Sequence, residues 1–407
     1  MKILIISHMY PSVFNEVNGI FVHQQIKELQ KQGCQIKVVS PVPWTPFPIK
    51  YFSKKWKRYS EIPKKTNWEG IEVFYPRYLE FPKNIFFASS GERMYLGIRK
   101  RVGQIYKDFR FDIIHSHVVL PDGYCGMSIA KEYKKPLIVT VHGQDFQNTI
   151  FLNKRCQENI KKVIDFSNGT VAVSNKLKKI GEKKLKINPD KMRVIPNGIN
   201  ADDIFEGESE LCKRYKGKKI ILSVSHLLKT KGLSLNLRAI DKLKEKYPDI
   251  FYLIIGEGEE RKNLQKLTKD LNLEKRIDLL GQLPHKKVME YLSICDIFSL
   301  PSWEEGFGIV YLEAMANGKS TIACQEEGID GIIRDRETGI LVKPKDMDSL
   351  VEAIDFLLSH PERAKEIGEK AKKLVLENYT WEKAVQKIIE IYKEILKNEK
   401  NTKNNLV

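Results

Sequence analysis

The sequence predicts an α/β protein built from two Rossmann-like domains that face a cleft. Three observations predict it. The chain has 407 residues, which is the length of about two ordinary domains. Short apolar runs of strand type alternate with helical segments, and this favours parallel sheets covered on both faces. The alternation breaks at the turn Pro196-Asn197-Gly198 and then starts again.

The first array begins with a βαβ unit. Lys2–Ser7 reads as a buried strand and is followed by a polar loop that contains Gly19. A helical pattern runs from Ile20 to Gln32, and Gln35–Ser40 is the next strand. Further strands are expected at Asp112–His117, Leu137–Val141, Gly169–Val173 and Met192–Ile195.

The second array restarts with the strand Lys219–Ser225. Its further strands are expected at Phe251–Gly256, Ile277–Gly281, Ile297–Leu300 and Ser320–Ala323. We therefore expect a first domain over residues 1–198 and a second over 199–380. A helix over 381–398 is expected to pack back on the first domain, and the polar residues 399–407 are expected to be disordered.

The net charge of +17 suggests contacts with a polyanion, although a lysine-rich solvated surface would explain it as well. No recognised nucleic-acid-binding module appears, so nucleic acid is not an expected partner. The six cysteines include no C-x-x-C pair, which is typical of reduced thiols in the cytosol. No apolar run approaches the ~18 to 20 residues of a membrane span, and the apolar start is too short for a signal peptide. We expect a cytoplasmic protein.

The segment Pro301–Gly318 carries the clearest chemical pattern. A strand end leads into the glycine-rich loop Glu304–Gly308, and Ile309 to Asn317 reads as a helix. Glycines let backbone amides approach a ligand, and a helix N-terminus favours phosphate. Glu313 falls in the second turn of the helix, where a carboxylate can bond ribose hydroxyls. Alone, the pattern would also fit a strand–helix connection with an incidental acid pair.

Glu305 and Glu313 form an E-x₇-E pair within S-x-x-E-G-F-G-x-x-x-x-E-A-M-A-x-G. This run resembles the signature of the retaining glycosyltransferases of family four (glycosyl transferases group 1), which have the GT-B fold. The resemblance continues over nearly the whole chain. It includes the opening KILIIS, the Asp112–His117 strand, Thr140–Asp145, Val173-Ser174, Ile195–Ile199, Lys231-Gly232, Gly256–Gly258 and Thr338–Val342.

The resemblance implies a site for a nucleotide-sugar donor, carried mainly by the second domain. Glu313 would hold the ribose and Glu305 would contact the transferred sugar. Lys231 would neutralise the diphosphate, whose negative charge grows as it departs. The backbone near the phosphates and sugar would come from Gly306, Phe307, Gly308 and Ile309.

One segment departs from the family pattern. The family usually has a Gly-Arg pair before the lysine, whereas this chain has Ser225-His226. His226 therefore stands where a second phosphate-binding cation is expected, and it could be protonated beside a diphosphate. Lys229 is an alternative for that role. Lys231 is retained, but the second of the two cations expected at the diphosphate is atypical.

Several first-domain residues match family positions at the cleft. His117 would lie near the transferred sugar, and His142 belongs to the acceptor side. Asp145 could support His142 or an acceptor hydroxyl. Gly19 occupies the first βα loop, where the family often has two glycines. His115 is expected to be a hydrogen-bonded filler of the core.

No D-x-D pair is placed as a metal ligand set, and the resemblance implies catalysis without a metal or another cofactor. The co-substrate would be a UDP- or GDP-sugar. The resemblance also implies retention at the anomeric carbon. Because no carboxylate is an obvious nucleophile, front-face attack is expected, with the leaving phosphate helping to deprotonate the acceptor.

The interval Trp44–Lys107 is aromatic and basic. Residues 50–107 contain 14 Lys and Arg against 5 Asp and Glu, a local net charge of +9 (14 − 5). Such a segment suits contact with anionic lipid head groups, so we expect reversible binding to the inner face of the cell membrane. The segment would also suit binding of a lipid-diphosphate acceptor. Alternatively, the aromatics pack on the first domain. The residues concerned are Trp44, Phe47, Tyr51, Phe52, Lys54, Lys55, Trp56, Lys57 and Arg58.

The function expected from these patterns is a sugar transferase in the synthesis of a surface polysaccharide, a glycolipid or a small glycoside. The acceptor is not specified by any motif. Two alternatives stay open: another GT-B enzyme, such as a nucleotide-sugar epimerase, and a non-catalytic binder of sugar nucleotides. The presence of both Glu305 and Glu313 favours the transferase.

Overall fold

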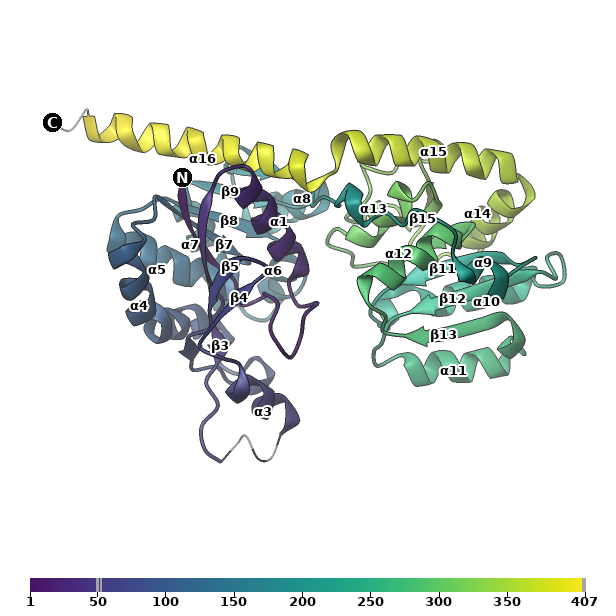
Figure 1. Ribbon diagram of the computed structural model, residues 1–407, viewed down its shortest axis with the longest axis horizontal. Helices are drawn as coiled ribbons and strands as arrows, with labels where there is room; N and C mark the ends of the chain where they lie inside the picture. The colour runs from purple at the N-terminus through teal and green to yellow at the C-terminus, as the bar shows by residue number, and fades with distance from the viewer. Residues whose placement is uncertain (49–50, 52, 405–407) are drawn as a thin grey trace. The chain divides into compact units, whose positions relative to one another are not determined.

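The computed structural model describes residues 1–48, 51 and 53–404, and it forms two compact units (Figure 1). Unit 1 comprises residues 1–196 together with the C-terminal segment from Ala384. Unit 2 comprises Asn197–Lys383. The chain thus changes unit within the turn at which the sequence places the end of the first domain. Phe52, a member of the predicted aromatic and basic segment, lies outside the described residues.

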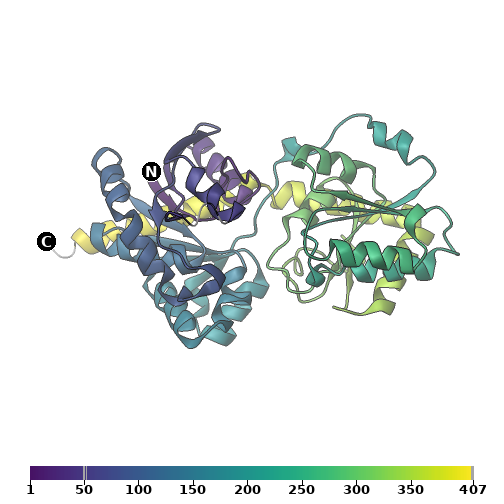
Figure 2. The same ribbon diagram turned by 90° about the horizontal axis from the view of Figure 1, so that it is seen from below.

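Unit 1 is built on an eight-stranded sheet with helices on both faces (Figures 1 and 2). The strand order is β10 (Met192–Val194), β9 (Gly169–Ala172), β8 (Leu137–Val141), β7 (Ile113–His117), β1 (Lys2–Ile6), β2 (Gln35–Val39), β5 (Ile71–Phe74) and β4 (Lys65–Trp68). The main helices are α1 (Ile20–Lys31), α4 (Ser90–Asp108), α5 (Tyr124–Tyr133), α7 (Lys154–Phe166) and α8 (Asn175–Leu185).

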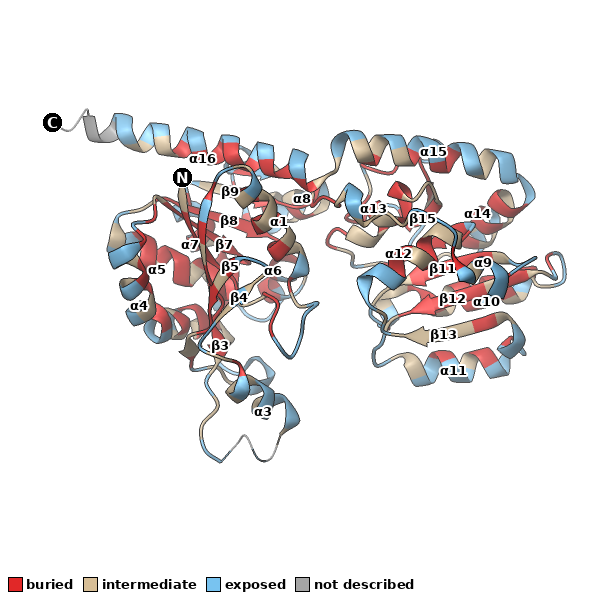
Figure 3. Cartoon of the chain, viewed as in Figure 1, coloured by how far each residue is buried: buried red, intermediate tan, exposed pale blue. Residues whose placement is uncertain are grey.

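The central strands of unit 1 are apolar because both of their faces are covered. In β1, Ile3 pairs in parallel with Ile36 on one side and Ile113 on the other, and residues 3–6 are fully buried (Figure 3). Parallel pairing sends the carboxyl ends of β1, β2, β7 and β8 to the same edge of the sheet. That edge is where open α/β sheets bind ligands.

The aromatic and basic interval is more structured than the sequence indicates. It contains β5, the antiparallel edge strand β4 and the 19-residue helix α4. A short helix, α3 (Lys54–Glu61), precedes β4, and a two-stranded ribbon pairs β3 (Val42–Pro43) with β6 (Arg77–Tyr78). The strands escape a periodicity search because they are only two to four residues long.

Unit 2 contains a six-stranded parallel sheet, again between helices. Its order is β13 (Ile277–Gly281), β12 (Ile250–Ile255), β11 (Lys219–Val224), β14 (Ile297–Ser299), β15 (Ser320–Cys324) and β16 (Ile340–Val342). Its helices are α9 (Glu210–Arg214), α10 (Leu233–Leu243), α11 (Arg261–Asp270), α12 (His285–Ile294), α13 (Ile309–Ala316), α14 (Met347–Ser359) and α15 (Pro361–Asn378).

The last helix, α16 (Trp381–Asn404), packs on unit 1 from Ala384 onward. Tyr392 is fully buried and bonds His115 of β7, with 2.6 Å between its hydroxyl and Nδ1. Gly169 makes room for the helix, since a Cβ there would lie 3.3 Å from Ile395. The sequence predicts this return of the helix correctly. It places the helix end at 398, however, whereas residues 399–404 are helical and not a disordered tail.

Candidate active site

The glycine-rich loop of unit 2 joins β14 to α13 in a way that needs glycine. Gly308 has φ of 84°, and a Cβ on it would lie 2.5 Å from the ring of Tyr311. A side chain at this position would therefore be strained and would clash. Gly306 and Phe307 are buried, and α13 begins at Ile309. The loop delivers the backbone amides of this helix N-terminus to the carboxyl edge of the sheet.

Lys231 and Glu305 form an ion pair with 2.6 Å between Nζ and Oε2, and their side chains are only 18% and 14% exposed. Two backbone contacts bring their segments together. Trp303 N donates to Thr230 O at 2.9 Å, and Gly232 lies so close to Pro301 that a Cβ would be 2.3 Å from its carbonyl oxygen. The predicted cation and the predicted sugar-contacting acid are therefore held together.

Glu327, which follows β15, holds the backbone of Glu305. Its Oε2 accepts from Glu305 N at 2.5 Å, and Gly328 N donates back to Glu305 O at 3.2 Å. Both backbone groups of Glu305 are thus fixed by one turn. The carboxylate of Glu327 is buried in this arrangement, with the residue only 9% exposed.

Glu313 on α13 is bonded to His285, the first residue of α12, with 2.8 Å between Oε1 and Nε2. The hydrogen bond to Glu313 raises the pKa of His285, against the opposing effect of burial. Glu313 is 16% exposed, so its carboxylate is oriented and still reachable.

His226 follows β11 in a loop that packs tightly on the Gly256–Gly258 turn. A Cβ at Gly258 would lie 2.4 Å from Leu227 O, and Leu227 N donates to Glu257 O at 3.0 Å. His226 and Lys229 are exposed. Among the residues that the structure describes, neither side chain forms a hydrogen bond or an ion pair, and so neither is bonded to Lys231 or Glu305.

Three histidine rings lie in a row at the carboxyl edge of the unit 1 sheet. His117 Nδ1 is 3.0 Å from His142 Nε2, and the rings of His115 and His117 stack at 4.4 Å. Burial lowers the pKa of His142 to about 3 and that of His117 well below its usual value, so both rings are neutral at pH 7. His117 Nε2 and His142 Nδ1 are buried without a partner among the described residues. Both nitrogens of His115 are bonded, to Tyr392 and Thr140, as expected of a filler.

Asp145 is fully buried, and its role differs from the predicted one. Its two oxygens accept from Val119 N at 2.9 Å and Leu120 N at 3.1 Å. Burial raises the pKa of Asp145 to about 7, although the two backbone donors favour the anion. Among the described residues Asp145 forms no hydrogen bond with His142, so that part of the prediction is wrong: its oxygens bond the loop after β7. The contact with an acceptor hydroxyl stays a prediction.

Gly19 precedes α1 and has φ of 64°. A Cβ on it would lie 2.2 Å from Met9 O, so only glycine allows the loop after β1 to pass this close to the helix.

No three His, Cys, Asp or Glu side chains in the ranges 1–48, 51 and 53–404 gather in a way that could hold a metal ion. In the same part of the chain, no helix combines the length and the apolar character that a membrane span needs.

Comparison with known proteins gives the family. The model of "Glycosyl transferases group 1" matches residues 212–374, and that of "Glycosyltransferase Family 4" matches residues 19–203. The chain belongs to the family 4 glycosyltransferases. It is 28% identical over 361 residues to TuaC of Bacillus subtilis, a protein provisionally named as a teichuronic acid biosynthesis glycosyltransferase. That match covers 87% of this chain and 88% of TuaC.

Solved structures of glycosyltransferases confirm the GT-B fold. The sucrose-phosphate synthase of Thermosynechococcus elongatus superposes with a TM-score of 0.80 at 18% identity, covering 98% of this chain and 100% of that one. Anabaena HepE in complex with UDP-glucose superposes with a TM-score of 0.73 at 17% identity, covering 97% and 100%.

In this family 4 glycosyltransferase, sequence reasoning missed His285 and Glu327. Glu327 lies in the loop after the buried strand β15, and His285 is the first residue of α12, which follows β13. The rule that ligands meet the carboxyl ends of parallel strands could have drawn attention to both. Their partners could not have been predicted, because one is a backbone N–H and the other lies 28 residues away.

Proposed function

We propose that this glycosyltransferase transfers a sugar from a UDP- or GDP-sugar to a hydroxyl acceptor, with retention at the anomeric carbon and without a metal ion. The observation that carries the proposal is the partly buried Lys231–Glu305 ion pair beside the N-terminus of α13. HepE, which shares the fold, is described in complex with UDP-glucose, and this supports a nucleotide-sugar donor.

Glu313, oriented by His285, would accept hydrogen bonds from the ribose hydroxyls. The amides of Gly306, Phe307, Gly308 and Ile309 would face the diphosphate and the sugar. Glu305 would contact the sugar, and its fixed backbone would limit the positions of its carboxylate. His226 would add a cation at the diphosphate when protonated.

Lys231 would provide the main electrostatic contribution. As the bond from the anomeric carbon to the diphosphate oxygen breaks, negative charge accumulates on the leaving group, and a fixed ammonium stabilises that charge. The acceptor oxygen bonds to the same face of the carbon, and its proton passes to the departing phosphate. Overall, the bond from the anomeric carbon to the diphosphate is broken, and a bond from that carbon to the acceptor oxygen is formed.

In unit 1, the neutral rings of His117 and His142 would bond sugar or acceptor hydroxyls through their unpartnered nitrogens. Gly19 would keep the loop after β1 close to α1 and so leave room for a ligand. Because burial disfavours the charged form of both histidines, they would act as hydrogen-bonding groups and not as acids.

The setting would be assembly of a surface polysaccharide or glycolipid at the inner face of the membrane. Trp44, Phe47 and Tyr51 expose 50%, 79% and 68% of their surfaces, and the adjacent α3 carries Lys54 and Lys57. Exposed aromatics beside lysines suit an interface with anionic lipid. TuaC, a relative of this chain, is named for the biosynthesis of a cell-wall polymer.

The test is a screen of UDP-, GDP- and ADP-sugars for hydrolysis and transfer, followed by NMR of the product. The proposal expects one donor to be consumed in the presence of EDTA and the product to keep the donor's anomeric configuration. An inverted product would refute retention, loss of turnover in EDTA would refute metal independence, and no turnover of any donor would refute the activity.

A further inference from the structure

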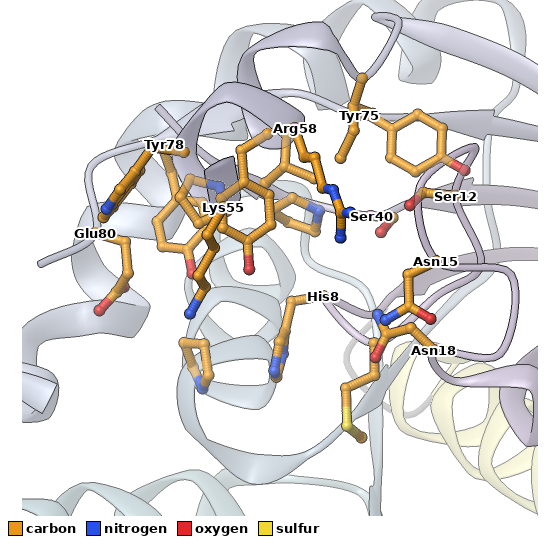
Figure 4. A pocket seen from close by; sticks show the side chains of 18 of the residues that line it. His8, Ser12, Asn15, Asn18, Ser40, Lys55, Arg58, Tyr75, Tyr78 and Glu80 are labelled. Carbon is orange, nitrogen blue, oxygen red and sulfur yellow. The ribbon is translucent and has the colours of Figure 1, made fainter. Parts of the chain in front are cut away.

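Unit 1 contains a cavity of about 810 Å³ at the carboxyl edge of its sheet (Figure 4). It is lined by residues that follow successive strands: His8 after β1, Ser40 after β2, Tyr75 after β5 and Gln144 after β8. This is the position at which an open parallel sheet binds ligands. Part of its lining comes from the aromatic and basic interval Trp44–Lys107.

The helix α3 presents one face to the cavity. The lining residues Lys55, Trp56, Arg58 and Tyr59, with Ile62 just beyond the helix, follow helical spacing. Lys54 and Lys57 do not line it, and Lys57 is paired with Glu61 at 3.9 Å. The basic segment thus has two faces, and only one of them is turned to this cavity.

The two cations of this face are not neutralised by acids. In the part of the chain that the structure describes, neither Lys55 nor Arg58 has an ion-pair partner. Lys55 Nζ instead lies 6.0 Å from the ring centroid of Tyr59. Glu80 also lines the cavity, but its carboxylate is 3.6 Å from Arg93, and burial raises its pKa.

His8 also lines the cavity, and Asp122 bonds its ring and its backbone. Asp122 is fully buried; Oδ1 accepts from His8 N at 2.7 Å, and Oδ2 is bonded to His8 Nδ1. Burial lowers the pKa of His8, but the charge and the hydrogen bond of Asp122 outweigh it and the net pKa is raised. Because Nδ1 is engaged and the side chain is 32% exposed, Nε2–H is the donor left for a ligand.

The charged groups that line the cavity are therefore mainly cationic, while its walls are aromatic. Figure 4 shows Arg58 on the side of Ser40 and Ser12, and Lys55 on the side of Glu80, with His8 between these groups in the view. Cations in a concave site with low-dielectric walls attract anions strongly. Rings such as those of Tyr59 and Tyr78 provide flat apolar surface for a sugar or a hydrocarbon.

We propose that this cavity binds the acceptor through an anionic group, a phosphate or a carboxylate, which Lys55, Arg58 and His8 contact. The proposal rests on the transferase function above and names the class of its acceptor: a hydroxyl compound that carries a negative charge. Asp122 occupies Nδ1 of His8 and favours its protonated form, in which Nε2–H can donate to the anion.

The experiment measures binding of matched pairs of probes to the full chain by calorimetry, without a donor. The pairs are glycerol 3-phosphate with glycerol, glucuronate with glucose, and dioleoylphosphatidate with dioleoylglycerol in mixed micelles. Each pair differs in the anionic group, so the pairs separate a free phosphate, a carboxylate and a lipid head group. We expect the charged member of at least one pair to bind about tenfold or more tightly than its partner, as charge-assisted hydrogen bonds provide.

The double variant Lys55→Ala/Arg58→Ala is expected to lose this preference. Both residues are exposed, so the fold should persist. Lys64→Ala removes an exposed lysine three residues beyond α3 that does not line the cavity, and it should keep the preference. Equal binding of charged and uncharged members in every pair would overturn the proposal, as would an equal loss in Lys64→Ala. Because donor hydrolysis is measured separately, a chain that binds anions but consumes no donor would refute the proposed function and leave the anion site standing.

Discussion

Lys231 Nζ lies 2.6 Å from Glu305 Oε2 in unit 2, although the two residues are 74 positions apart in the sequence. The pair joins the two segments that the family resemblance marks as donor-binding. It also explains how Lys231 is oriented before any diphosphate is present, since Glu305 fixes the ammonium and Glu327 fixes Glu305.

Replacing Lys231 by alanine is expected to lower kcat for donor turnover by about 100-fold or more. The reason is that the ammonium stabilises charge that develops only as the diphosphate departs, and removal of one such group typically costs 10²–10³ in rate. Initial rates at saturating donor provide the measurement. Lys373→Ala, an exposed lysine on α15, is the matched control and should keep the wild-type rate. A Lys231 variant with the rate of this control would contradict the assigned role.

Glu327→Ala is expected to lower kcat by about tenfold to 100-fold with less change in KM for the donor. Without the acceptor for Glu305 N, the carboxylate of Glu305 can move, and a shift of about 1 Å can have this effect. Glu327→Gln should restore most of the rate, because its amide oxygen can accept the same hydrogen bond. If the glutamine variant is as slow as the alanine variant, loss of the hydrogen bond to Glu305 N does not explain the lower rate.

The His285–Glu313 bond predicts a pH-dependent contribution to stability. The folded-state pKa of His285 is raised, so its contribution is complete below the unfolded value of about 6.5 and is lost as pH rises through the folded value. His285→Ala should therefore lower Tm more at pH 6 than at pH 9. Because His285 is 44% exposed, the difference should be below about 1 kcal/mol. An equal loss at both pH values would contradict this linkage.

Anion binding in the unit 1 cavity is expected to weaken as pH rises. His8 faces Asp122 directly, with Asp145 and Glu80 near it, and Lys55 and Arg58 line the same cavity. The net effect of the acids is to raise the pKa of His8, so the imidazolium persists above 6.5 and is lost at higher pH. Glucuronate is the suitable probe, since its carboxylate stays ionised between pH 6 and 9. His8→Gln should remove the pH dependence of glucuronate binding. If binding by this variant still weakens with pH as in the wild type, a group other than His8 is responsible.

Binding to anionic vesicles is expected to depend on Phe47, which is 79% exposed. Flotation with phosphatidylglycerol vesicles at low salt should recover the wild-type protein, and Phe47→Ala should reduce the recovered fraction several-fold. Phe151 is 62% exposed elsewhere on unit 1, so Phe151→Ala is the control and should behave as wild type. Absence of flotation for the wild-type protein would rule out the membrane role.

The sequence predicts the buried strands well because both of their faces are apolar. The predicted strand Leu137–Val141 coincides with β8, and Lys2–Ser7 exceeds β1 by one residue. It does not reveal β4, whose residues Lys65–Trp68 are half-exposed at the sheet edge, where a hydrophobic pattern is weak.

The candidate site, like the strands, was predictable from the sequence only in part. Glu305, Glu313 and Lys231 stand in recognisable motifs, so the sequence selects them as site residues, but it does not predict the ion pair between Lys231 and Glu305. The His8–Asp122 pair joins residues 114 positions apart, and no local pattern marks either of them. The bonds from Val119 N and Leu120 N to Asp145 could not be predicted either, because sequence spacing does not show that its oxygens face the loop after β7.

The most direct test of the central claim compares the wild-type protein with Glu305→Ala on the panel of UDP-, GDP- and ADP-sugars, with release of the nucleoside diphosphate as the readout. The account predicts that the wild-type protein consumes one of these donors and that Glu305→Ala lowers its turnover by at least about 100-fold. Equal turnover by the two proteins, or no turnover of any donor by the wild type, would contradict it.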